Sequence, residues 1–372
     1  MRFILIANPK NRRVTLFTEA LREAGLDAPE VVSWLEVLRT PEKLEELSSA
    51  PALLRIDSFG EDFEVERELL ARGGFESAAT YEERRGEVIA PAVAHRGFQR
   101  VMTEVLRPLL AKRPKWIQLN PLPEIDEFFD KRLTSRRFRD AGIPIPEFLD
   151  EVPTRAAPLL AAARAMGWKQ IFVKPAMGSS ASGVLLVSVS ARDGGPVEIR
   201  TSLEWDAPRW FNNLKLSHYR TAEDTTRALD FILAQGAQVE RAIPKGKLDD
   251  AFFDCRVLCI AGEPRFIVVR QNKHAITNLH LGGWRGDVDA LKAALAPGAW
   301  DSMLATCRRV AAFYRSLHLG LDVMFEADME RHRVIEANAF GDLFPGALLD
   351  GRSVYRWEID EALRLFRVPT PT

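Results

Sequence analysis

A lysine followed by a glycine- and serine-rich segment is the first feature that could do chemistry. An apolar run from Ile171 to Val173 ends at Lys174 and Pro175, and the segment 178–183 then leads into a second apolar run. This pattern predicts a strand, a loop and a strand. The backbone N–H groups of such a loop can approach anionic oxygens closely, and Lys174 can add a positive charge, so phosphate binding is one interpretation. The other is a hairpin with a mobile tip and an ordinary surface lysine.

Three oxygen-bearing side chains follow near the end of the chain. Asp322 lies in the apolar run 320–325, and Glu336 and Asn338 lie in the run 333–338. Because side chains alternate along a strand, Glu336 and Asn338 point to the same face. Magnesium prefers carboxylate and amide oxygens, and unpaired carboxylates are costly to bury. The pattern therefore indicates either a cation site or structural salt bridges to arginines.

Other residues are less specific. Lys131 begins a short basic helix that Gly142 ends, and the charge pattern alone favours a solvated lysine. The aromatic residues between 191 and 220 could cover a substrate, but packing in the interior is their commoner use. Cys255 and Cys259 share one face of a predicted strand, so we expect both in the core.

The elements that must position these residues fall into three regions. Residues 1–122 alternate apolar strands with amphipathic helices, which predicts an open α/β domain with a parallel sheet. Residues 123–242 carry the lysines and the glycine-rich loop, and residues 243–372 carry the predicted metal ligands. Within them, 191–220 is predicted to form a hairpin plus an excursion, and 252–270 an antiparallel hairpin.

Composition narrows the class of protein. The 372 residues suffice for two or three domains, and the net charge of −1 provides no basic field for nucleic acid or an anionic membrane. The three cysteines form no CxxC pair, so neither a disulfide framework nor a zinc ribbon is indicated, and a cytoplasmic location is expected. We find no signal peptide and no apolar stretch of membrane-spanning length. GxGxxG, Walker A, GxSxG and HExxH patterns are also missing from the sequence.

The order of these motifs resembles the ATP-grasp superfamily. Within it, the run 278–283 is most similar to RimK-type glutamate ligases and their glutathione-synthetase-like relatives. The residues that carry the resemblance are 130–131, 141–144, 173–175 with 178–180, 254–257, 278–283, and Asp322 with 336–338.

The resemblance implies an α/β and α+β fold, in which an N-terminal open parallel-sheet domain precedes two α+β subdomains that clasp ATP. It implies Asp322, Glu336 and Asn338 as ligands of Mg²⁺, with Mn²⁺ as the alternative ion. The residues implied for nucleotide binding are Lys131, Phe172, Lys174, Gly178, Ser179, Ser180, Gly183, Gln238, Glu240, Ala242, Ile243, Met324 and Ile335.

The chemistry implied is transfer of the γ-phosphate of ATP to a carboxylate, which an amine then attacks to give an amide. Such a transfer needs positioning and charge neutralisation, and no protein nucleophile is expected. The residues expected to act on the substrates are Arg256, Arg270 and Asn278, with Asn272 and Arg285 as further candidates for holding an acidic substrate.

The substrates are not implied by the resemblance, because Thr277 stands where RimK-type sequences tend to carry arginine or another polar group and the segment 339–346 departs from the usual pattern. We expect an amino acid or peptide, or a peptide or protein carboxylate, and a monomer or homodimer. Two other functions stay open: modification of a ribosomally made peptide or protein, and nucleotide binding without ligase activity.

Overall fold

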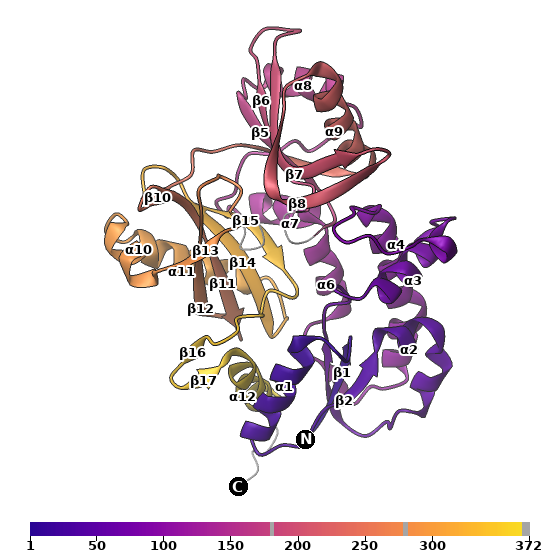
Figure 1. Ribbon diagram of the computed structural model, residues 1–372. Coiled ribbons are helices and arrows are strands. Elements are labelled where there is room, and N and C mark those ends of the chain that lie inside the picture. The colour runs from indigo at the N-terminus through magenta and orange to yellow at the C-terminus, as the bar shows by residue number, and fades with distance from the viewer. Residues whose placement is uncertain (179–181, 278–281, 367–372) are drawn as a thin grey trace.

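The computed structural model describes residues 1–178, 182–277 and 282–366. Three sheets with their helices form the frame, and they correspond to three bodies in the ribbon view (Figure 1). The N-terminal sheet is parallel, and the central and C-terminal sheets are antiparallel. The expected combination of α/β and α+β architecture is confirmed.

The N-terminal sheet has the order β2-β1-β3-β4, and all its neighbouring strands are parallel. Its strands are largely buried apolar runs, as expected when helices cover both faces. The strands are β1 (Arg2–Ala7), β2 (Glu30–Ser33), β3 (Ala52–Ile56) and β4 (Trp116–Gln118). The helices are α1 (Arg12–Glu23), α2 (Trp34–Arg39), α3 (Phe63–Gly73), α4 (Pro91–Val101), α5 (Arg107–Ala111) and α6 (Leu122–Phe129), with a π-helical turn at Met102–Leu106 and 3₁₀ turns at Pro41–Glu46 and Ala78–Thr80.

Two element boundaries in this domain differ from the sequence pattern. The run 31–34 predicts a strand that includes Trp34, but Trp34 begins α2 because Ser33 and Glu36 form a capping box. The pattern over 97–111 predicts a helix that begins at Gly97, but the helix begins at Pro91. Gly97 lies within it for a packing reason: a Cβ there would meet the backbone oxygen of Leu69 at 1.9 Å, so only glycine allows α4 to lie this close to α3.

The central sheet has the order β8-β7-β6-β5-β9, and all its neighbours are antiparallel. The stretch 191–220 forms one long hairpin of β7 and β8. The aromatic residues in this hairpin pack as expected, since Trp210 stacks on Phe231 at 5.4 Å and contacts Trp205 at 5.0 Å. The elements are α7 (Lys131–Asp140), α8 (Ala156–Ala165), β5 (Gln170–Pro175), β6 (Leu185–Val189), β7 (Val197–Asp206), β8 (Arg209–Tyr219), α9 (Ala222–Ala234) and β9 (Ala237–Arg241).

The C-terminal sheet has the order β13-β12-β11-β14-β15, with β10 paired to β11. The predicted hairpin of β11 and β12 is confirmed, and Cys255 and Cys259 are buried in the core as expected. The elements are β10 (Lys247–Leu248), β11 (Ala251–Ile260), β12 (Glu263–Asn272), β13 (Trp284–Gly286), α10 (Val288–Ala294), α11 (Ala299–Ala311), β14 (His318–Phe325) and β15 (His332–Asn338).

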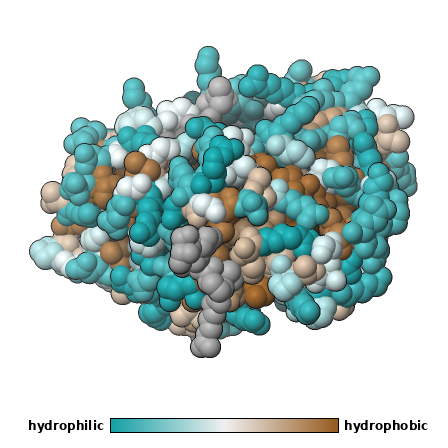
Figure 2. Space-filling view, turned by 90° about the horizontal axis from the view of Figure 1, so that it is seen from below, coloured by the Kyte–Doolittle hydropathy of each residue, from teal (hydrophilic) through white to brown (hydrophobic). Residues whose placement is uncertain are grey.

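The last helix, α12 (Val354–Leu365), follows the short pair β16 (Leu348–Leu349) and β17 (Arg352–Ser353) and packs on α1 (Figure 1). Its Tyr355 and Ile359 belong to the same apolar cluster as Phe17 of α1. Helix α12 thus packs against the N-terminal domain. The face on the side of the two termini is largely hydrophilic, with hydrophobic patches between the polar side chains (Figure 2).

Within the residues that the structure describes, no helix is both long enough and apolar enough to cross a membrane.

Candidate active site

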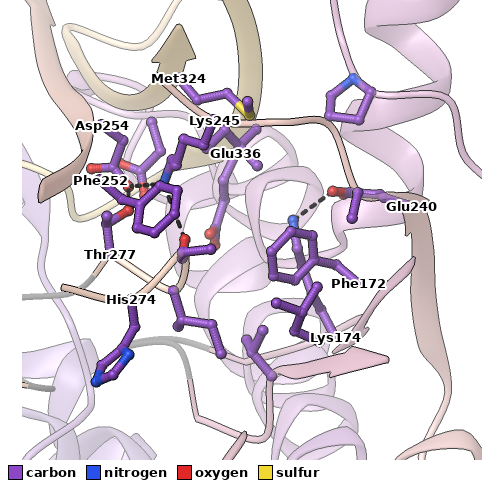
Figure 3. Close-up of a pocket in the computed structure, with 18 of the residues that line it drawn as sticks. Phe172, Lys174, Glu240, Lys245, Phe252, Asp254, His274, Thr277, Met324 and Glu336 are labelled. Carbon is purple, nitrogen blue, oxygen red and sulfur yellow. Dashed lines mark hydrogen bonds and ion pairs between the residues drawn. The ribbon is translucent and has the colours of Figure 1, made fainter. Parts of the chain in front are cut away.

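A cavity of about 400 Å³ lies between the central and C-terminal sheets. Both sheets and α7 contribute to its wall, and Figure 3 shows charged groups on two opposite sides of it. The apolar part of its wall includes Phe172, Leu186, Ala242, Ile243, Met324 and Ile335. A cavity of this size, with apolar walls and a few charged groups, is typical of a small-molecule site.

Alternation along β5 places its two predicted ligand-binding side chains in the cavity. Phe172 and Lys174 line it, whereas Ile171 and Val173 are fully buried in the core. The Nζ atom of Lys174 lies 2.6 Å from Oε2 of Glu240 on the neighbouring strand β9 (Figure 3). Lys174 and Glu240, both predicted to bind nucleotide, are therefore paired with each other.

Lys131 joins the loop to the predicted metal ligands. It follows Asp130, whose carboxylate caps α7 by accepting from the N–H of Arg132, and its side chain is only 10% exposed. Its Nζ atom donates to the backbone oxygen of Gly178 at 2.7 Å and lies 3.3 Å from Oε1 of Glu336. The solvated lysine that the charge pattern favoured is thus a buried group of the cavity wall.

Asp322 and Glu336 lie opposite each other on β14 and β15, and Asn338 lies two residues further along. Arg256 and Arg270 both donate to the carboxylate of Asp322, Arg270 through Nη2 at 3.0 Å. Burial alone would raise the pKa of Asp322, but the two guanidinium groups outweigh burial and hold that pKa well below its usual range.

The donor set fits a divalent cation. It combines two carboxylates and one amide on neighbouring strands, which are hard oxygen ligands. Asn338 lines the cavity, and its Nδ2 atom is buried without a hydrogen-bond partner among the described residues. Among the described residues Glu336 forms an ion pair with Lys131, and its side chain is 24% exposed, so its carboxylate is accessible to a cation.

A row of alternating charges runs from Asp322 to Lys245, and sequence reasoning did not identify Lys245 as part of the site. Arg270 bridges Asp322 to Asp254, whose Oδ1 accepts from Nε of Arg270 at 2.6 Å. Asp254 in turn pairs with Lys245, at 3.2 Å from Nζ to Oδ2. Lys245 was missed because a lysine after a predicted strand, between proline and glycine, is usually a surface residue.

The remaining predicted residues lie in different places. Gly178 lines the cavity, but Gly183 packs against Pro175 and Ile232 instead. Gln238 does not line the cavity either, because it is fully buried and its Nε2 atom donates to Ser135 of α7 at 3.3 Å. Asn272 and Arg285 are also outside the cavity lining. Ser179, Ser180 and Asn278 lie outside the described residues, as does the remainder of the two loops at 179–181 and 278–281.

Comparison with known proteins finds a match at the level of the fold. No protein-family model matches the chain, and no curated protein matches its sequence. Among solved structures, D-cycloserine synthetase DcsG matches with a TM-score of 0.54 and 16% identity over 98% of this chain and 100% of that one. The ATP-grasp ligase PsnB complexed with minimal precursor matches at 0.53 and 16% identity over 98% and 99%. D-alanine–D-alanine ligase from Bacillus anthracis matches at 0.51 and 13% over 99% of both chains.

The chain therefore has the fold of the ATP-grasp ligases along nearly its whole length. The cavity between its two antiparallel sheets holds the lysines, the carboxylates and the arginines that the motifs singled out.

Proposed function

We propose that this protein is an ATP- and Mg²⁺-dependent carboxylate–amine ligase that forms an amide bond through an acyl phosphate. The observation that carries the proposal is one cavity in which apolar walls, the lysines Lys131 and Lys174, and the Asp322–Glu336–Asn338 set meet. On this proposal the chain divides into residues 1–122, 123–242 and 243–372, with ATP between the last two parts. The similarity to RimK-type ligases and the cytoplasmic location stay predictions from the sequence.

The chemistry needs charge neutralisation more than covalent help from the protein. A carboxylate oxygen of the donor substrate attacks the γ-phosphorus, and ADP leaves with the bridging oxygen. An amine nitrogen then attacks the acyl carbon, the bond from carbon to the phosphate oxygen breaks, and the amine gives up a proton. Lys131 and Lys174 would balance the phosphate charge, and Arg256 would face the group being transferred.

Asp322, Glu336 and Asn338 would hold Mg²⁺, which supplies charge neutralisation at the phosphates when bound. Phe172, Met324 and Ile335 would enclose the adenine, with Glu240 and the backbone at Ala242 and Ile243 at its polar edge. In the structure Glu240 pairs with Lys174, so we propose that nucleotide binding exchanges part of this contact for contacts with ATP.

The proposal is tested by ATP turnover with Mg²⁺ and a panel of amino acids and short peptides. We expect release of ADP and phosphate that depends on the acceptor, and a product lighter by one water than its two precursors. Glu336→Gln and Lys174→Ala should each lower turnover on the order of 100-fold, since the charge contacts they remove are worth several kcal/mol.

Matched controls are Glu330→Gln and Lys169→Ala, which change exposed residues outside the cavity. If Glu336→Gln and Lys174→Ala both keep the turnover of these controls, the site assignment is wrong.

A second candidate is modification of a ribosomally made peptide. It is favoured by the fold match to PsnB complexed with minimal precursor and to macrocyclase MdnC bound with precursor peptide MdnA, the latter at a TM-score of 0.52 and 12% identity. Loss of water from a single peptide, without a second substrate, would favour this candidate over ligation of free amino acids. Nucleotide binding without turnover for any acceptor would instead indicate a binding protein.

A further inference from the structure

Lys245 is a buried lysine in the cavity wall, on the side opposite Lys174 and Glu240 (Figure 3). Its side chain is 8% exposed. Its Nζ atom lies 3.2 Å from Oδ2 of Asp254 and 3.4 Å from the backbone oxygen of Ala275, and it also donates to Oγ1 of Thr277. Three parts of the chain therefore meet at one ammonium group: the segment after β9, strand β11 and the segment after β12.

The hydrogen bonds at this point have one consistent direction. An ammonium group has three N–H donors and no acceptor, and three acceptors surround Lys245. The Thr277 hydroxyl accepts from Lys245 and donates to Asp254. All the donors of Lys245 are thus used within the protein, so this lysine is not available to bind a phosphate or a substrate directly.

Lys245 fixes the position of Asp254, the carboxylate that also pairs with Arg270. Asp254 is 2% exposed and accepts from Lys245, Thr277 and Arg270, and the last of these contacts sets the position of the guanidinium group. Arg270 reaches from Asp254 to Asp322, the predicted metal ligand. Lys245 and Thr277 also hold residues 275–277 against β11, where they line the cavity.

We propose that Lys245 is a positioning residue for the donor carboxylate of the ligase, at the subsite where that carboxylate becomes an acyl phosphate. Through Asp254 it orients Arg270, and with Thr277 it holds the cavity wall beside Arg270. This inference rests on the proposed function. It assigns a role to Thr277, the position at which the sequence departs from RimK-type ligases. In this arrangement the guanidinium group of Arg270, held between Asp254 and Asp322, would face the donor carboxylate.

Lys245→Met tests this proposal, because methionine fills similar space without donors. We expect kcat/KM for the donor carboxylate to fall at least about tenfold, as for loss of a supporting contact, while KM for ATP changes by less than about twofold. Lys245→Arg should restore part of the lost activity, because it keeps the charge and several donors. Lys169→Met is the matched control, at an exposed lysine outside the cavity.

Hydrogen exchange gives a readout that does not depend on turnover. In Lys245→Met the backbone amides of residues 275–277 should exchange faster than in the wild type, with the amides of β5 unchanged. If Lys245→Met keeps the wild-type kcat/KM for the donor carboxylate, the positioning role is wrong. It is also wrong if KM for ATP rises by the same factor as kcat/KM for the donor falls. If the wild-type protein turns over no ATP with any acceptor, the proposed function itself fails.

The pH profile separates the role of the charge from that of the volume. Burial lowers the pKa of Lys245, and Asp254 offsets part of this effect; Arg270 and Asp322 are the other charged groups that act on it. As pH rises through this lowered pKa, the third N–H donor is lost, so activity should fall on the alkaline side before a solvated lysine would titrate. In Lys245→Arg this fall should move to higher pH, and an identical alkaline limb in both proteins would contradict the proposal.

Discussion

Asp322 and Glu336 lie opposite each other on two strands, but their surroundings differ. Asp322 is 7% exposed and receives two arginines, which hold its pKa well below its usual range against the effect of burial. Within the described part of the chain Glu336 is paired with Lys131, whose Nζ atom lies 3.3 Å from Oε1, and its side chain is 24% exposed. Asp322 is therefore part of the packed charge row, and Glu336 is the more accessible of these two predicted metal ligands.

We predict that Asp322→Asn and Glu336→Gln differ in stability but not in activity. Asp322→Asn leaves Arg256 and Arg270 without their shared carboxylate and should cost about 3 kcal/mol of unfolding free energy. Glu336→Gln removes a partly exposed pair and should cost less than about 1 kcal/mol. Both should lose Mg²⁺-dependent ATP turnover. Urea unfolding monitored by circular dichroism measures the difference, and equal destabilisation by the two changes would contradict the account of the row.

At the scale of elements, β14 and the segment after β15 cross at two glycines. A Cβ on Gly341 would lie 2.6 Å from the Cα atom of Gly320 and 3.3 Å from Nη1 of Arg256. Real Cβ atoms do not approach backbone this closely, so both positions need glycine for this crossing. The segment 339–346 is the one whose sequence departs from the usual pattern of the family that the chain resembles. The crossing holds this segment next to Arg256, which lines the cavity.

We predict that Gly341→Ala displaces this segment. It should cost about 1–3 kcal/mol of unfolding free energy, because the backbone must move to admit the methyl group. Turnover should fall with it, since Arg256 borders the same space. Gly60→Ala is the control, because its added Cβ would meet only Ser58 Oγ, at 3.4 Å. If Gly341→Ala keeps the wild-type melting temperature and turnover, the crossing can admit a methyl group and the prediction is wrong.

The elements and side-chain directions that could be predicted are those set by residues close together in the sequence. Strands β1, β3, β5 and β11 are long apolar runs, and their pattern alone indicated the sheets. Lys174, Glu336 and Asn338 sit in such strands, so their side chains could be assigned to one face. Gln238 obeys the same alternation, yet α7 covers it, and no pattern within β9 reports that helix.

Lys245 shows the opposite case. Its sequence surroundings indicate a surface turn, and its burial depends on Asp254 and Thr277, which are distant along the chain. Contacts of this kind are set by the packing of three segments rather than by the residues next to the lysine. Trp34 is a milder example, because the capping box at Ser33 outweighs its preference for a strand.

At the scale of the whole molecule, a buried charge cluster joins the N-terminal domain to the C-terminal sheet. Arg55 of β3 contacts Glu358 of α12 at 2.6 Å and also pairs with Asp342, which lies four residues after Asn338. Arg13 of α1 pairs with Asp342 as well. Burial lowers the pKa of His318 beside them to about 3, so this ring is neutral near pH 7.

We predict that Asp342→Asn is far more damaging than Glu358→Gln. The arginines Arg13 and Arg55 hold the pKa of Asp342 below its usual range against burial, whereas burial raises the pKa of Glu358 well above its own. Asp342→Asn removes the carboxylate that two buried arginines share, although Asp57 stays near both and Glu358 stays paired with Arg55. The loss of this shared charge should cost about 3–5 kcal/mol. Glu358→Gln removes a group that binds its proton readily and should cost less than half as much. Thermal or urea unfolding at pH 7 measures both.

The sign of the pH effect provides a check on Asp342. Its folded-state pKa is depressed, so its contribution to stability is complete above the unfolded-state pKa of about 4 and is lost as pH falls through the folded-state value. The stability difference between wild type and Asp342→Asn should therefore shrink as pH is lowered below about 4. A difference that stays constant into acid would mean that Asp342 acts through its shape rather than its charge.

A second, smaller contact joins the N-terminal domain to the central sheet. The backbone of residues 86–88 pairs with edge strand β8, with N–H donors from Val88 to Trp210 at 2.9 Å and from Asn212 to Gly86 at 2.6 Å. The side chain of Glu87 is 6% exposed and pairs with Arg209 at 3.1 Å. The N-terminal domain is thus attached to both sheets that border the cavity.

We predict that Glu87→Gln loosens this second attachment and not the fold. Loss of the Arg209 pair should speed hydrogen exchange in β8 and raise KM for ATP several-fold, because the central sheet can then move relative to the C-terminal one, with little change in melting temperature.

Burial and the contact with Glu87 raise the pKa of Tyr81 to about 12, so its phenol should titrate closer to 10 in the variant. NMR of ring-labelled tyrosine can resolve this shift among the four tyrosines of the chain. Glu82→Gln, at an exposed neighbour, is the control, and an unchanged KM for ATP with a lowered Tyr81 pKa would show that the attachment does not govern the cavity.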